Sequence, residues 1–179
     1  GVMRLPRRDQ VTLSGGLAWR PKSNDLCVKA VHRARDGVYC VKDIRPGRHG
    51  AAVELTRAGS GVVKDFDFSA DGRTLAISLS TTTRPPEVHV LPARGSDRYR
   101  KLTDQNPHMA NWKLPQIKKV QWRSKDGTEV EGILELPPGY DGKSKLPLVV
   151  EIHGGPTSST REELRFWIYG RTLLAAQGW

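Results

Sequence analysis

The sequence has few residues of the kind that cross-link a fold. It contains two cysteines, Cys27 and Cys40, and neither belongs to a C-x-x-C pair. Both fall in apolar, strand-like segments, where a free cysteine behaves as a small hydrophobic residue. A disulfide between them is left open, and the low cysteine content fits a reducing compartment or a chain that needs no cross-link. We therefore expect a cytoplasmic location, with an upstream signal peptide also left open.

Metal-binding and nucleotide-binding patterns are also missing. The five histidines stand alone, without a second potential ligand at helical or hairpin spacing. Residues 142–144 (Gly-Lys-Ser) resemble the end of a phosphate-binding loop, but Pro137 stands where that loop needs its first glycine. A strand-like run follows instead of the helix whose N–H groups would bind phosphate. We therefore expect neither a metal ion nor a cofactor.

Long apolar runs are absent too. No stretch approaches the ~18 apolar residues that span a membrane, so we expect no membrane partner. The net charge is +10 and the isoelectric point is near 9.9, a balance that can indicate a nucleic-acid partner. The Lys and Arg residues are scattered along the chain, however, so we do not expect nucleic acid to bind. Basic and aromatic residues interleave in residues 117–125, which the two faces of an amphipathic strand explain more simply than a nucleic-acid platform.

What the sequence does contain is an internal repeat in its first hundred residues. Three short segments recur at an offset of 49 positions and a fourth recurs at 47: residues 17–21 and 66–70, 26–28 and 75–77, 38–41 and 87–90, 54–56 and 101–103. Each unit reads as four short strands, with period-two alternation of apolar residues and Gly- or Pro-rich turns. Four strands in about 40 to 50 residues are typical of a β-propeller blade. An independent β-sandwich is the alternative.

A propeller needs about four to eight blades to close around its axis, and this chain holds about two. Two isolated blades would leave unpaired edges. We therefore expect further blades upstream of Gly1.

The pattern changes after residue 105. Residues 117–125 and 130–136 are amphipathic strands, and Asp126-Gly127 between them is a strong hairpin signal. Residues 148–152 form a short, nearly continuous apolar run, which is typical of a strand buried on both faces. Residues 162–177 have helical character, and Gly178 is a natural helix stop.

In order and spacing, these features resemble the prolyl oligopeptidase family, most closely its acylaminoacyl-peptidase and dipeptidyl-peptidase-like branches. The matching segments run from about residue 15 to residue 179: 68–72, 84–88, 102–106, 124–132, 146–156 and 174–179. The resemblance implies about two all-β propeller blades followed by the N-terminal part of an α/β-hydrolase domain, incomplete on both sides. It places the blades in residues 1–110 and the start of the peptidase domain in residues 111–179.

The resemblance also assigns the loop His153-Gly154-Gly155-Pro156 to the oxyanion hole. Attack on a peptide carbonyl builds negative charge on its oxygen, and fixed backbone N–H groups stabilise that charge. Glycines let the backbone approach the substrate, and an H-G-G-type loop supplies one donor in α/β-hydrolases. By resemblance, Gly155 carries this donor and Gly154 shapes the turn. His153 stands where some branches have a tyrosine, which favours the acylaminoacyl-like branch. A plain Gly-Gly turn after a strand is the alternative.

The nucleophile pattern G-x-S-x-G does not occur. Ser14, Ser60 and Ser96 each adjoin a glycine, but none has glycines at both −2 and +2. In this fold the serine precedes the aspartate and the histidine in chain order. We therefore expect no member of the catalytic triad in this chain, and all three beyond Trp179.

The resemblance implies that the chain is part of a serine peptidase that hydrolyses short peptides by acyl transfer. Its partners would be the peptide substrate, the upstream blades and the downstream catalytic segment of the same protein. We expect this segment alone to be inactive. Two alternatives stay open: an esterase-like α/β-hydrolase, and a non-enzymatic, truncated propeller that acts as a basic binding module.

Overall fold

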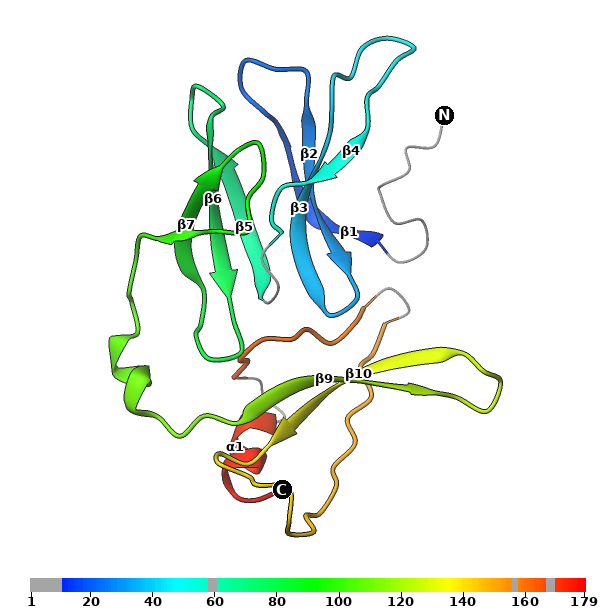
Figure 1. Cartoon of the computed structure of the whole chain (residues 1–179), viewed down its shortest axis with the longest axis vertical. Helices are drawn as coiled ribbons and strands as arrows, with labels where there is room; N and C mark the ends of the chain where they lie inside the picture. The colour runs from blue at the N-terminus through cyan, green and yellow to red at the C-terminus, as the bar shows by residue number, and fades with distance from the viewer. Residues whose placement is uncertain (1–10, 58–60, 156–157, 167–169) are drawn as a thin grey trace.

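The computed structural model describes residues 11–57, 61–155, 158–166 and 170–179. Its first part consists of two four-stranded antiparallel sheets that lie side by side (Figure 1). The first sheet contains β1 (Val11–Trp19), β2 (Leu26–His32), β3 (Arg35–Val41) and β4 (Ala52–Glu54), in that order. The second contains β5 (Val62–Phe68), β6 (Thr74–Ser80), β7 (Glu87–Pro92) and β8 (Arg100–Lys101), in that order.

The second sheet repeats the first strand for strand. In both sheets each strand pairs with the next one along the chain, so the predicted repeat of four short strands is confirmed. On β6, Leu75, Ile77 and Leu79 are buried and alternate with the less buried Thr74, Ala76 and Ser78, as a strand with one face in a core requires. Both sheets therefore have the strand arrangement of propeller blades, and the predicted fold class is confirmed.

The main hydrophobic core combines residues of both blades. It includes Val38 and Leu55 from the first blade and Leu75, Ile77 and Leu91 from the second, all nearly inaccessible to solvent. Burial of an aliphatic side chain of this size stabilises a fold by about 1.5–3 kcal/mol. The two blades are therefore joined by a shared apolar layer.

A glycine turn adds a polar link between the blades. Gly72, in the turn between β5 and β6, has φ +68°, and a Cβ at this position would lie 2.2 Å from the carbonyl oxygen of Pro21. The Arg20 guanidinium donates a hydrogen bond to the Gly72 carbonyl at 2.7 Å. Only glycine accommodates both the positive φ and this close approach.

The two cysteines form a disulfide. Cys27 on β2 lies directly opposite Cys40 on β3, and both are fully buried. The sequence left this pairing open, because it does not reveal the strand register. The cysteine content therefore no longer supports a reducing compartment.

A buried carboxylate fixes the chain where it leaves the blades. Glu87 is 3% exposed; it accepts a short hydrogen bond from the Thr103 hydroxyl and another, of 2.8 Å, from the Gln105 amide. Burial alone would raise the pKa of Glu87, but these hydrogen bonds outweigh it and hold the pKa below its ordinary value. Arg84 donates a 2.9 Å hydrogen bond to the Asn106 carbonyl at the same exit.

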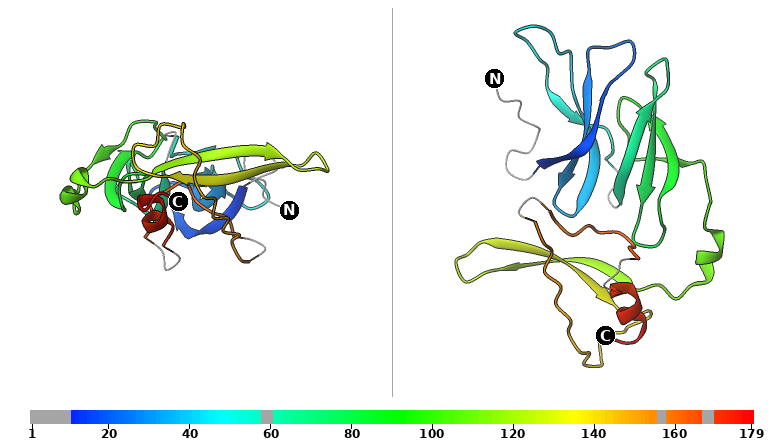
Figure 2. Two further views of the ribbon diagram at one scale, coloured as in Figure 1. Left: turned by 90° about the horizontal axis from the view of Figure 1, so that it is seen from below. Right: turned by 180° about the vertical axis from the view of Figure 1, so that it is seen from behind.

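A hairpin follows the blades. The chain passes through the 3-10 helix η1 (Pro107–Asn111), in which the predicted domain boundary falls, to β9 (Gln116–Arg123) and β10 (Glu129–Leu136). These two strands pair as predicted, and Gly127 in their turn has φ +86°. They form an arm below the blades (Figures 1 and 2).

Two sequence predictions for the last part of the chain are wrong. Residues 148–152 form no strand, and Leu148, Val149, Val150 and Ile152 are 56–87% exposed. A doubly buried strand needs a strand on each side, and no strand among the described residues pairs with this segment.

The predicted helix over residues 162–177 is reduced to α1 (Arg171–Ala176). Gly178, with φ +91°, follows it as the expected stop. Residues 167–169, within the predicted helix, lie outside the described residues. None of the helices in the described ranges is long and apolar enough to cross a membrane.

Candidate functional site

The candidate oxyanion loop is an exposed turn. His153, Gly154 and Gly155 follow the extended residues 148–152, and all three are exposed. Gly155 has φ +81°, and its carbonyl accepts a 3.2 Å hydrogen bond from the Ser158 amide. A side chain at residue 155 would strain this backbone, so the turn requires glycine.

Both glycines face open space. A Cβ built on Gly154 would have no neighbouring atom within 4 Å, and one on Gly155 would lie 3.7 Å from the Ser158 Cβ. The backbone here is therefore accessible to a ligand. The structure thus brings the three predicted residues together on one turn, whereas their role as hydrogen-bond donors stays a prediction. Pro156 lies outside the described residues.

The histidine of the loop shows no arrangement suited to a general base. The His153 Nδ1 lies 3.4 Å from the Gly154 carbonyl oxygen, and the rings of His49 and His89 likewise contact backbone carbonyls. These contacts are compatible with the expectation that the catalytic histidine lies elsewhere.

An ionic cluster that sequence reasoning missed lies just before the loop. The Arg171 Nε on α1 is 3.5 Å from the Glu151 carboxylate and 3.6 Å from the Glu135 carboxylate on β10. Burial raises the pKa of Glu135 despite the nearby Arg171 charge. The three side chains come from separate elements, so no sequence spacing could have revealed the cluster. It ties α1 and β10 to the segment that leads into His153.

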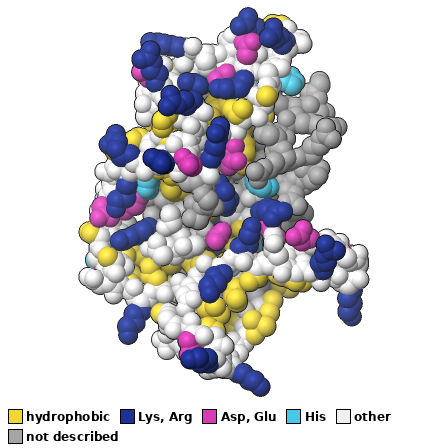
Figure 3. Space-filling model, viewed as in Figure 1, with side chains coloured by type: hydrophobic (Ala, Val, Ile, Leu, Met, Phe, Trp, Pro, Cys, Tyr) yellow, Lys and Arg dark blue, Asp and Glu magenta, His cyan; other side chains and the backbone are white. Residues whose placement is uncertain are grey.

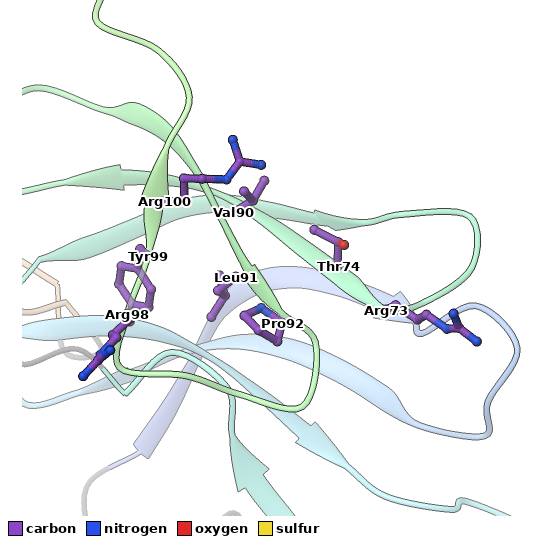
Figure 4. A pocket seen from close by; sticks show the side chains of 8 residues that line it. All are labelled: Arg73, Thr74, Val90, Leu91, Pro92, Arg98, Tyr99 and Arg100. Carbon is purple, nitrogen blue, oxygen red and sulfur yellow. The ribbon is translucent and has the colours of Figure 1, made fainter.

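Other parts of the surface offer less. A shallow cavity of about 440 Å³ lies on the second blade, among residues of β6, β7, β8 and the turns beside them (Figure 4). Arg73, Arg98 and Arg100 line it, but their guanidinium groups point in different directions and do not converge on one ligand. In the described part of the chain, no three His, Cys, Asp or Glu side chains gather as potential metal ligands.

Comparison with known proteins gives the site its context. No protein-family model matches the chain. It is 27% identical over 168 residues to the uncharacterized peptidase YuxL of Bacillus subtilis, a match that covers 90% of this chain and 23% of the relative. It is 28% identical over 172 residues to the acylamino-acid-releasing enzyme of Sus scrofa, which covers 89% of this chain and 22% of that enzyme. The chain thus spans less than a quarter of these curated relatives.

A solved structure shares the fold. The acylaminoacyl peptidase of Pyrococcus horikoshii superposes with a TM-score of 0.71 and 21% identity, over 95% of this chain and 24% of that one. The blades therefore follow one another, and lead into the hairpin, as they do in a peptidase of known structure. Similarity to peptidases along nine tenths of its sequence, together with this shared fold, agrees with the chain's resemblance to the prolyl oligopeptidase family.

Proposed function

We propose that this chain is part of a serine peptidase that hydrolyses short peptides, of the acylaminoacyl-peptidase or dipeptidyl-peptidase-like type. The observation that carries the proposal is the Gly154-Gly155 turn. It is an exposed turn with a positive φ at Gly155, in a chain that aligns with peptidases along most of its length. The Ser-His-Asp triad belongs to a part of the protein outside this chain.

In this mechanism the chain contributes electrostatic stabilisation. A serine attacks the scissile carbonyl, a histidine takes the serine proton, and negative charge develops on the carbonyl oxygen. The Gly155 N–H donates a hydrogen bond to that oxygen, while Gly154 keeps the approach free of a side chain. Loss of one such donor typically lowers kcat by about 10²–10³-fold.

The proposal is tested by activity with and without the rest of the protein. The full-length protein should cleave either an acyl-alanyl or an unblocked dipeptidyl chromogenic substrate, and a serine-directed covalent inhibitor should abolish this cleavage. The 179-residue chain alone should show no cleavage. Cleavage of esters but not of peptides by the full-length protein would instead favour an esterase. Inhibitor-sensitive cleavage by the 179-residue chain would refute the placement of the triad.

A further inference from the structure

The segment that leaves the candidate oxyanion loop crosses the ends of both blades. Residues 158–164 run between the two sheets and the β9–β10 hairpin in front and rear views (Figures 1 and 2). Their contacts therefore decide how the loop sits relative to the propeller.

Two ion pairs hold this segment, one to each blade. Arg161 pairs with Asp36 on β3, and their side chains are 16% and 8% exposed. Glu163 pairs with Lys64 on β5 at 2.6 Å, and the Glu163 side chain is 3% exposed. Burial of a carboxylate costs free energy unless a cation or hydrogen-bond donor accompanies it. Asp36 and Glu163 therefore need Arg161 and Lys64 as their partners.

Backbone hydrogen bonds reinforce the ion pairs. The Glu162 amide donates to the Ala34 carbonyl at 2.9 Å, and the Leu164 amide donates to the Thr81 carbonyl at 2.7 Å. Ala34 belongs to the turn between β2 and β3, and Thr81 to the loop after β6. The Leu164 side chain is buried beside Met109.

The alternation of charges fixes the register of the segment. Arg161 and Glu163 carry opposite charges two positions apart, and their partners lie on different blades. A shift of the segment along the blades would separate both cations from their carboxylates. Such a buried charge pattern specifies one alignment at the expense of others.

The turn of the first blade also reaches the hairpin arm. Arg33, the neighbour of Ala34, forms a 3.0 Å ion pair with Glu131 on β10. Arg33 has φ +58°, an uncommon backbone conformation for a residue with a side chain. The same blade turn thus contacts both the hairpin and the segment that follows the candidate loop.

We propose that Arg161 and Glu163 are positioning residues for the candidate oxyanion loop. By pairing with Asp36 and Lys64 they pin the segment after Gly155 to both blades, so that the propeller sets the place of the donor backbone. We call these four residues the latch. The proposal rests on the proposed function for its effect on catalysis, but not for its structural part.

The structural part is tested by amide hydrogen exchange on the 179-residue chain. In an Asp36→Asn, Lys64→Gln variant, we expect the Glu162 and Leu164 amides to exchange at least about 10-fold faster, because each amide adjoins a residue whose ion pair to the blades is lost. The Ile77 amide, within the core strand β6, should keep its protection and thereby report an intact fold.

A matched control and a rescue variant make this test specific. Asp104→Asn removes the exposed ion pair between Lys101 and Asp104 and should leave both amides protected. The charge swap Lys64→Glu with Glu163→Lys should restore protection that Lys64→Glu alone removes. Unchanged exchange in the Asp36, Lys64 variant, or no rescue by the swap, would overturn the latch.

The catalytic part is tested in the full-length protein. The Asp36→Asn, Lys64→Gln variant should lower kcat by about 10–100-fold with little change in KM, because a small misplacement of a positioned group is enough to cost such a factor. Loss of active protein through unfolding would instead lower the titrated active-site concentration. An unchanged kcat in a variant whose Glu162 and Leu164 amides exchange freely would overturn the positioning role. An inactive wild-type protein would refute the proposed function and leave the exchange result to decide the latch.

Discussion

At the scale of single residues, Glu87 shows how one buried carboxylate can fix a connection. Its neighbours donate hydrogen bonds from Thr103 and from the Gln105 backbone, and these bonds favour the ionised form. The chain that leaves the second blade is therefore held by the Glu87 carboxylate. From the sequence alone, Glu87 is simply one residue of a predicted strand.

We predict that Glu87→Gln lowers the free energy of unfolding by about 1–3 kcal/mol near neutral pH, since it weakens buried hydrogen bonds to a charged acceptor. The folded-state pKa of Glu87 lies below its ordinary value of 4.5. The stability that ionised Glu87 contributes is therefore fully present above the ordinary pKa of 4.5. It is lost as the pH falls through the lower pKa of the folded state. Urea unfolding at neutral pH and at several acidic pH values measures both effects.

The matched control for this experiment is Glu129→Gln, which changes an exposed carboxylate on β10. It should leave the unfolding free energy nearly unchanged. A Glu87→Gln variant as stable as the wild type at neutral pH would show that the hydrogen bonds of Glu87 do not stabilise the segment that leaves the second blade.

Among the strands, β2 and β3 are cross-linked inside the core. The disulfide Cys27–Cys40 spans 13 positions and closes a hairpin loop. Such a bond limits the freedom of the unfolded chain, and for a loop of this length the chain-entropy model gives about 3 kcal/mol.

We therefore predict that reduction lowers the stability of the chain by about 2–3 kcal/mol, measured by denaturant unfolding with and without a phosphine reductant. A Cys27→Val, Cys40→Val variant should not respond to the reductant. Titration of the denatured, unreduced protein should find no free thiol. Two free thiols in protein purified without reductant would contradict the cross-link.

The strands also show how far the sequence alone could lead. Period-two alternation and the 49-residue offset are local patterns, so the blades and the Asp126-Gly127 hairpin were predictable. The disulfide was not, because it depends on which residue of β3 lies opposite Cys27. The helix over 162–177 failed at its start, where Leu164 is buried beside Met109 in a non-helical segment held by the latch.

For the candidate site, the glycines were predictable from the sequence, but the ion pairs that hold the adjacent segment were not. The Gly154-Gly155 motif can be recognised in the sequence itself, and the positive φ of Gly155 is a conformation that glycine adopts readily. The ion pairs of the latch join residues about 100 positions apart or more, so no spacing rule connects them. The composition of residues 148–152 predicts a buried strand, but strand pairing depends on neighbouring strands, which composition does not reveal.

At the scale of the whole molecule, charged side chains are dispersed over the surface, whereas exposed hydrophobic side chains are more localised. Lys and Arg side chains are spread over the whole of the face shown, while exposed hydrophobic side chains are most extensive in its lower part (Figure 3). The latch joins the blades to the segment after the candidate loop, and the Arg33–Glu131 ion pair joins the first blade to the β9–β10 hairpin. These contacts fix the candidate loop relative to the blades.

We propose that the Gly155 backbone N–H stabilises the oxyanion of a peptidase. The most direct test is a crystal structure of the full-length protein with a peptide boronate bound to its nucleophile, in which a boronate oxygen stands in for the oxyanion. We predict that the Gly155 nitrogen lies about 2.7–3.1 Å from that oxygen. A boronate oxygen held by other donors, with the Gly155 N–H turned away from it, would contradict this role of Gly155.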